Sequence, residues 1–226
     1  MTAPDGGGVV EPRLLSINVG LPMEVRWREK TVKTSIFKAP LSGRIPVHRL
    51  NLAGDQQSDL TVHGGVHKAV YVYPSEHYEY WREELPGAEL GWGAFGENFT
   101  SEGLLEDTTH IGDRLGIGTA EFSVTQPRMP CFKLAIRFGR ADMVKRFLQS
   151  RRSGFYLSVS KEGEVEAGDP VRVLSRDENA VSVMDIVGLY TADGANQELL
   201  RRASELAALP EEWRVYLRKR LWAPDA

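Results

Sequence analysis

The spacing of apolar residues along this chain changes once, near residue 180, and this change limits the folds that the chain can adopt. Before it, short runs of alternating apolar and polar residues are separated by glycine-rich and polar turns, as in short β-strands. After it, apolar residues recur at the spacing of an amphipathic helix. We therefore predict a mainly β domain with some helix over residues 1–178 and a small three-helix module over residues 179–226. Many short strands with few helices favour a small barrel with flanking helices over a parallel sheet.

The expected strands and helices can be placed by residue number. Strands are predicted at 13–19, 30–38, 47–52, 68–73, 154–160 and 169–174, and a hairpin over 114–126 turns at Gly118-Thr119. Helices are predicted at 75–85, capped by Ser75, and at 133–150, interrupted at Gly139. The three C-terminal helices are predicted at 182–190, 196–209 and 210–222, with Pro210 at the first helical position.

Charge and composition exclude several classes of protein. The chain has 226 residues, with 28 Lys and Arg against 31 Asp and Glu, so its net charge is −3. Such a chain is not expected to bind nucleic acid or a membrane surface through its overall charge. Residues 1–13 lack the basic and apolar regions of a signal peptide, and no apolar run reaches the roughly 20 residues that span a bilayer. We therefore expect a cytoplasmic protein.

Cys131 is the only cysteine of the chain and lies in the segment VTQPRMPCFKLAIRFG, residues 124–139. A single cysteine excludes an intramolecular disulfide and any metal centre that needs several thiolates from this chain. Arg128 and Lys133 flank it, and Pro130 suits the start of a helix. Nearby cations and a helix N-terminus both favour the thiolate over the thiol. The segment thus predicts a reactive cysteine, and a buried cysteine packed as a small apolar side chain is the alternative.

A loop suited to ligand binding is predicted within AGDQQSDLTVHGGVHKAVY, residues 53–71, between two strands. Gly64 and Gly65 allow the backbone to turn with positive φ or to approach a ligand closely. An ordinary glycine-rich turn with histidines at the surface explains the same composition. A zinc site is a further alternative, although no helical or finger spacing supports it. It would use His63, His67 and Asp59.

Two further segments carry side chains suited to a binding site. FGENFT, residues 95–100, places Glu97 and Asn98 before a short apolar run, and an ordinary turn with an asparagine explains it equally well. Residues 128–152 contain eight basic residues and one acidic residue, Asp142. We expect most of these basic side chains to form a solvated helix face.

These segments, taken in this order, resemble the MOSC-domain family, which is named for the C-terminal domain of molybdenum cofactor sulfurase. The resemblance rests on GDQQSDLTVHGGVHKAVYVYP, FGENFTSEGLLEDTTHIGDRLGIGTAEFSVTQPRMPCFKL and EAGDPVRVL, and it covers residues 44–174. The C-terminal helices resemble the three-helix extension of the YiiM-like bacterial branch, which is linked to resistance against hydroxylaminopurine. The resemblance implies a MOSC-type β-barrel that binds molybdenum cofactor in its molybdopterin form.

The resemblance also implies roles for the candidate site residues. Cys131 matches the single motif cysteine of the family, so it is expected to bind molybdenum and to be the catalytic residue. The expected cofactor-binding residues are His63, Gly64, Gly65, Lys68, Glu97, Asn98, Arg128 and Lys133. The cations among them suit a phosphate or an anionic pterin, and the carboxylate and amide suit the amino and carbonyl groups of the pterin.

The function implied by the resemblance is the reduction of N-hydroxylated compounds, such as hydroxylaminopurine and related base analogues, to amines. A flat substrate needs an aromatic side chain on which to stack, and four residues are candidates for this role. We expect at least two of the four to be core residues instead. These candidates are Tyr71, Tyr73, Trp92 and Phe95. Two alternatives stay open, namely a sulfur carrier that uses a Cys131 persulfide for metal–sulfur cluster or cofactor assembly, and a non-enzymatic carrier of molybdenum cofactor.

The reduction consumes two electrons per cycle, and the sequence shows no site for an electron-carrying cofactor. A ferredoxin-type cluster needs four cysteines, and no G-x-G-x-x-G follows a strand and opens a helix. We therefore expect a separate electron-donating reductase as a partner, guided by the basic run over residues 137–152. A homodimer is left open.

Overall fold

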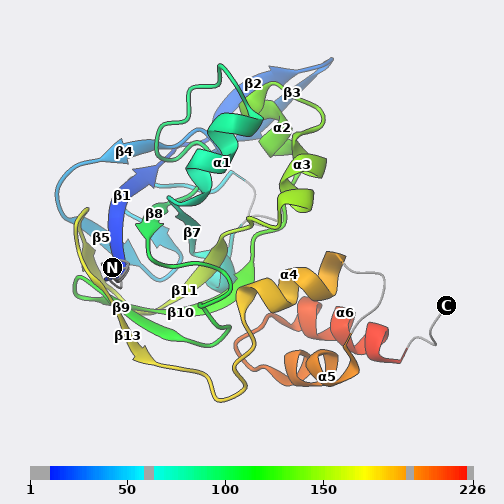
Figure 1. The fold of residues 1–226 in the computed structure, drawn as a ribbon. Coiled ribbons are helices and arrows are strands. Elements are labelled where there is room, and N and C mark those ends of the chain that lie inside the picture. The colour runs from blue at the N-terminus through cyan, green and yellow to red at the C-terminus, as the bar shows by residue number, and fades with distance from the viewer. Residues whose placement is uncertain (1–10, 59–63, 192–195, 223–226) are drawn as a thin grey trace, which may run out of the picture.

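The structure is a computed structural model that describes residues 11–58, 64–191 and 196–222. Figure 1 shows a large curved sheet, with one group of helices beside a projecting hairpin and the C-terminal helices packed below them. The strands are β1 (Arg13–Val19), β2 (Met23–Trp27), β3 (Lys30–Thr34), β4 (Ala39–Leu41), β5 (Ile45–His48), β6 (Asn51–Leu52), β7 (Val70–Pro74), β8 (Phe99–Glu102), β9 (Arg114–Ile117), β10 (Ala120–Pro127), β11 (Phe155–Lys161), β12 (Gly163–Val165) and β13 (Val171–Ser175). The helices are α1 (His77–Glu84), α2 (Phe132–Phe138), α3 (Met143–Ser150), α4 (Val183–Thr191), α5 (Gln197–Glu205) and α6 (Glu211–Leu221), with a short 3-10 helix η1 (Val66–Lys68).

One sheet joins eight of the described strands in the order β13-β9-β10-β11-β7-β8-β1-β4. The Val171 amide donates a hydrogen bond to the Pro12 carbonyl (2.7 Å), and the Leu14 amide donates one to the Asp169 carbonyl (3.0 Å). These bonds bring the start of β1 beside the start of β13, although the two strands lie far apart in the sheet order. The described residues thus form a mixed α/β fold with one large sheet, whereas closure of this sheet into a barrel stays a prediction.

Two small sheets account for most differences from the predicted strands. The strand predicted at 30–38 ends at Thr34 as β3 and pairs with β2, which the sequence analysis missed. No residue of β2 is buried, so the apolar alternation that reveals a half-buried strand is weak there. The strand predicted at 47–52 is divided between β5 and β6, because the chain reverses at Arg49-Leu50.

The predicted helices are present, but two predicted starts are wrong. Helix α1 begins at His77, and its N-cap residue is Glu76 rather than Ser75. Ser75 contributes through its carbonyl, which accepts a hydrogen bond from the Tyr78 amide (3.0 Å). Pro210 is the N-cap residue of α6 and lies just before its first turn.

A single hydrophobic cluster joins the sheet to the C-terminal helices. Phe122 and Leu157 of the sheet lie in the same buried cluster as Leu200 of α5 and Leu217 of α6. The C-terminal helices therefore pack directly against the sheet, as Figure 1 also shows for α4 and β10. The domain boundary after residue 178 stays a prediction.

A second cluster is aromatic and lies beneath α1 and α3. Its members include Tyr73, Tyr78, Trp81, Phe95 and Phe147, all almost fully buried. This cluster forms the floor behind the candidate site. In the described part of the chain, no helix is long and apolar enough to cross a lipid bilayer.

Candidate functional site

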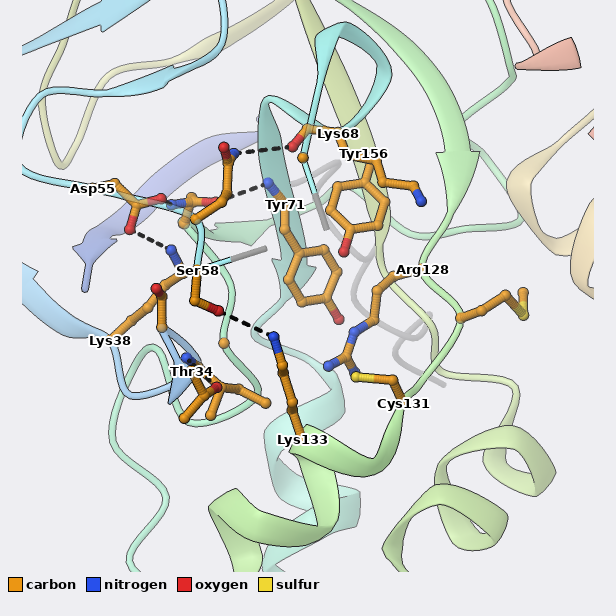
Figure 2. Close-up of a pocket in the computed structure, with 17 residues that line it drawn as sticks. Thr34, Lys38, Asp55, Ser58, Lys68, Tyr71, Arg128, Cys131, Lys133 and Tyr156 are labelled. Carbon is orange, nitrogen blue, oxygen red and sulfur yellow. Dashed lines mark hydrogen bonds and ion pairs between the residues drawn. The ribbon is translucent and has the colours of Figure 1, made fainter. Parts of the chain in front are cut away.

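A cavity opens where β3, the segment before η1, strand β7 and the start of α2 come together. Figure 2 shows that side chains from separate parts of the chain point into it. The residues that line it include Thr34, Lys38, Asp55, Ser58, Gly64, Lys68, Tyr71, Asn98, Arg128, Cys131, Lys133 and Tyr156. Six of the predicted site residues are therefore brought together at one place.

Cys131 lies at the junction of β10 and α2, as the sequence predicts. It is the N-cap residue of α2 and has an extended backbone, and its carbonyl accepts a hydrogen bond from the Leu134 amide (2.9 Å). Helix α2 ends at Gly139, whose left-handed backbone (φ 64°) favours glycine. In Figure 2 the Cys131 sulfur lies beside the guanidinium of Arg128. The only thiol of the chain therefore lies next to a permanent positive charge at the start of α2.

Arg128 is the most deeply buried cation of the cavity. Its residue is 6% exposed, and its guanidinium lies over the rings of Tyr71 (5.2 Å) and Phe147 (4.9 Å). Its Nη1 atom finds no hydrogen-bond partner among the described residues. A buried donor without a partner costs about 1–3 kcal/mol, so this group is suited to an acceptor or an anion that enters the cavity.

Further cations surround the same space. Lys133, the second residue of α2, is buried and donates from Nζ to the Ser58 hydroxyl (3.0 Å). Lys68 at the end of η1 and Lys38 also line the cavity, whereas Asp55 is the one carboxylate in the described lining. The cavity therefore carries an excess of positive charge and is suited to an anionic ligand.

The pair of Lys38 and Asp55 is a part of the site that the sequence analysis missed. Lys38 Nζ lies 2.5 Å from Asp55 Oδ1, and both side chains are buried. The Asp55 carboxylate also accepts hydrogen bonds from the Gly20 amide (2.8 Å) and from Asn98 Nδ2 (2.9 Å). Burial lowers the pKa of Lys38, and Asp55 partly opposes this effect. Asp55 lies within the segment identified as a binding loop, but only the fold shows its partner.

Glu97 is placed outside the cavity lining, contrary to the role expected for it. Its carboxylate is fully buried and accepts hydrogen bonds from the amides of Gly93 (2.8 Å) and Phe95 (3.0 Å). It also accepts from the hydroxyl of Thr100 (3.0 Å) and from the hydroxyl of Tyr78. Glu97 therefore holds the preceding loop in shape, and its oxygens are engaged by the protein itself.

Asn98 lines the cavity, but its amide is largely engaged by the protein as well. Its Oδ1 accepts a hydrogen bond from the Tyr71 amide (3.1 Å), and its Nδ2 donates to Asp55 and to the Asn18 carbonyl (3.3 Å). We therefore assign Asn98 the role of holding Asp55 and strand β7 in place. This role differs from the direct contact with pterin that the resemblance implies.

The glycines and histidines of the predicted binding loop do not all lie at the cavity. Gly64 lines the cavity, whereas Gly65 precedes η1 with φ 85° and is absent from the described lining. His63 and Asp59 lie outside the described residues, and His67 is exposed. Among the described residues, no group of three or more His, Cys, Asp and Glu side chains could hold a metal ion.

Of the four aromatic candidates for a stacking face, Tyr71 lines the cavity. Tyr73 and Phe95 are fully buried in the aromatic cluster, and Trp92 packs at its edge against Tyr78. The expectation that at least two would be core residues is thus confirmed. Tyr156, which the sequence analysis did not select, lies 5.3 Å from the Tyr71 ring and extends the aromatic wall.

Comparisons with known proteins identify the family of this chain. The MOSC domain matches residues 59–172, and the YiiM-like 3-alpha helix domain matches residues 181–222. The uncharacterized protein YflK of Bacillus subtilis is 41% identical to this chain over 92% of it and 93% of YflK. Protein YiiM of Escherichia coli is 34% identical over 83% of this chain and 84% of that protein. A protein named reductase from Gibberella moniliformis is 30% identical over 77% of this chain but only 32% of its own length.

A crystal structure of YiiM from Geobacillus stearothermophilus has a similar fold. Its TM-score is 0.77 at 35% identity, and the match covers 93% of this chain and 99% of that one. The chain therefore belongs to the MOSC-domain family. Its C-terminal helices place it in the YiiM-like branch of that family, as the resemblance suggested.

Proposed function

We propose that this protein binds molybdenum cofactor in the cavity and reduces N-hydroxylated compounds, such as hydroxylaminopurine, to amines. The observation that carries the proposal is the position of Cys131, the only thiol of the chain, in a cavity lined by Lys38, Lys68, Arg128 and Lys133. MOSC domains are associated with binding of molybdenum cofactor, and one relative bears the name reductase.

The residues present fit this cofactor. The described residues offer one thiol and no cluster of three metal-binding side chains, so a metal must bring most of its ligands with it. The dithiolene of a pterin supplies such soft ligands, and one protein thiolate completes them. The unpartnered Nη1 of buried Arg128 is suited to the negative charge of the group.

We assign the cofactor-binding roles as follows. Cys131 supplies the thiolate, and Arg128 beside it stabilises the negative charge. Lys133, Lys68 and the hydroxyl of Ser58 offer donors for a phosphate or an anionic pterin. When bound, the cofactor supplies two-electron redox chemistry, which no side chain of the cavity provides.

The substrate side of the cavity offers a stacking face and a source of protons. Tyr71 and Tyr156 present adjacent rings to a flat base. Conversion of R–NHOH to R–NH₂ consumes two electrons and two protons and releases water. Because burial lowers the pKa of Lys38, its ammonium gives up a proton more readily than an exposed lysine does. We assign Lys38 Nζ as the donor to the departing oxygen.

The experiment that tests the proposal compares the wild-type protein with Cys131→Ser, which keeps the size of the side chain. Both proteins are purified from cells that make molybdenum cofactor, and molybdenum and pterin contents are measured. Turnover of hydroxylaminopurine is then followed with a reduced viologen dye as electron donor. We expect molybdenum and turnover in the wild type and loss of turnover in Cys131→Ser.

Other outcomes would favour the alternatives. Molybdenum without turnover would favour a carrier of the cofactor. A persulfide on Cys131 without molybdenum would favour a sulfur carrier, because a reactive cysteine also serves that role. Full turnover in Cys131→Ser would refute the assignment of Cys131 as metal ligand.

A further inference from the structure

A shallow groove crosses the outer face formed by the β2–β3 hairpin, α2 and α3, and it continues to the end of α4. Its two halves share Ala141 and Val144 near the start of α3, so they form one continuous depression. Figure 1 shows these elements along one side of the molecule, with the hairpin at one end and α4 at the other. The groove is separate from the candidate cofactor cavity, whose described lining shares no residue with it.

The floor of this groove is apolar and open to solvent. Phe132 is 52% exposed and Tyr190 is 41% exposed, and both line the groove. Trp27 and Leu148 line it as well and are half-buried. Single exposed apolar side chains are ordinary, but a contiguous set in a depression marks an interaction surface.

The rim of the groove is basic. The charged residues that line its two halves are Arg28, Lys30, Lys145, Arg151 and Glu29, all exposed. Four of these five side chains are therefore positive, although the chain as a whole has a net charge of −3. Complementary charge steers association and selects partners, so this surface is suited to an acidic protein.

The groove also lies next to the thiol of the cavity. Phe132 lines the groove, whereas Cys131 before it and Lys133 after it line the cavity. The first turn of α2 therefore contributes to both sites, because one of its faces lines the cavity and another lines the groove. A partner seated over Phe132 reaches the side of the cavity that carries Cys131.

We propose that this groove docks a small acidic electron-transfer protein that supplies electrons to the cavity. The inference rests on the proposed function, because reduction of each R–NHOH to R–NH₂ and water consumes two electrons and two protons. Two one-electron carriers, or one flavin hydroquinone, balance each cycle by becoming oxidised, and the solvent replaces the protons that Lys38 and the cavity deliver. The apolar floor supplies the contact area, and the basic rim guides encounter.

The test uses the full chain and two acidic probes, a flavodoxin and a [2Fe–2S] ferredoxin. Binding of each probe is measured by titration at low and high salt, with no substrate present. The groove variants are Lys30→Glu and Lys145→Glu, and the control is Arg172→Glu. Arg172 is exposed on β13, at an edge of the large sheet, and its reversal changes the net charge equally. Turnover is measured separately with each reduced probe and with a viologen dye.

We expect at least one probe to bind the wild type, with affinity that falls as salt rises. Each groove variant should weaken binding about tenfold, and the control should change it less than about twofold. Turnover driven by the dye should stay unchanged in the groove variants. Failure of the proposed function would therefore appear in the dye assay, whereas failure of the docking proposal would appear in the titration. The docking proposal would be overturned if neither probe binds, or if the control variant weakens binding as much as the groove variants do. It would also be overturned if duplex DNA competes with the probes equally well.

Discussion

The indole N–H of Trp213 donates a hydrogen bond of 2.8 Å to the side-chain oxygen of Gln126, which joins helix α6 to strand β10. The other end of this amide, Nε2, donates to the carbonyl of His67 in η1 (3.3 Å), directly before Lys68. The indole therefore fixes the orientation of the Gln126 amide, because an indole can donate but cannot accept. The C-terminal helices thus reach the rim of the cavity through two hydrogen bonds.

We expect Trp213→Phe to loosen η1 more than it destabilises the fold. The substitution keeps an aromatic ring in place but removes the donor to Gln126, at a cost of about 1 kcal/mol in the free energy of unfolding. Hydrogen–deuterium exchange of the amides over residues 66–70 should become a few-fold faster. Tyr216→Phe is the matched control, since the Tyr216 ring lies 6.1 Å from that of Trp213. Equal exchange in both variants would contradict a role for Trp213 at the rim.

Removal of the C-terminal helices should destabilise the whole protein. Leu200, Leu206, Leu209 and Leu217 of this region are buried in the cluster shared with the sheet. Burial of each such side chain contributes about 1.5–3 kcal/mol, so a chain that ends at Arg176 should lose cooperative unfolding or melt far earlier. The full chain is the control and should melt in one cooperative transition. Calorimetry measures the melting transition of the truncated chain. Unchanged melting would instead indicate that the C-terminal helices fold as an independent module.

Arg128→Met should lower cofactor content without a comparable loss of stability. The substitution removes a buried donor without a partner, which offsets the loss of the contacts with Tyr71 and Phe147. We expect the free energy of unfolding, measured in urea without cofactor, to change by less than about 1 kcal/mol. Molybdenum and pterin content after purification should fall sharply, whereas Arg172→Met should retain both. Large destabilisation with unchanged cofactor content would assign Arg128 a structural role instead.

Lys38 should give the stability of the protein a distinct pH dependence. Because burial lowers the pKa of Lys38 in the folded protein from its usual value of 10.5, folding favours the neutral amine. This contribution to stability is complete above the unfolded pKa and is lost as the pH falls through the folded pKa. Between these two values the free energy of unfolding should therefore rise with pH, relative to Lys38→Met. Urea unfolding at about pH 8 and about pH 10 measures this difference, and a constant difference would contradict it.

Local patterns in the sequence predicted the parts of the fold that depend on neighbouring residues. The hairpin at Gly118-Thr119 is confirmed by the pairing of Ile117 with Ala120, and the glycine there adopts a positive φ of 57°. The start of a helix after Cys131 and its end at Gly139 are also confirmed. In each case the turn or cap residue itself determines the local backbone.

Partners that are distant in the sequence were the main omission. Lys38 and Asp55 meet only because the segment between β3 and β4 and the segment after β6 lie beside the same cavity, and no periodicity reveals such a pair. Glu97 was assigned to the site because of its charge and its motif. Three of its four donors, on Gly93, Phe95 and Thr100, lie within four residues of it. The fourth is the hydroxyl of Tyr78 in α1, and only the folded backbone turns these groups toward the carboxylate.

The position of β7 in the sheet has a consequence for the entry of any ligand into the cavity. Strand β7, which carries Tyr71 of the cavity, pairs with β8 on one side and with β11, from much later in the chain, on the other. Pairings between distant segments form slowly, because a long loop must close first. The cavity therefore takes shape only after most of the chain has been synthesised and folded. A zinc ion in a finger organises its own binding site, whereas a ligand of this cavity enters a protein that is already complete.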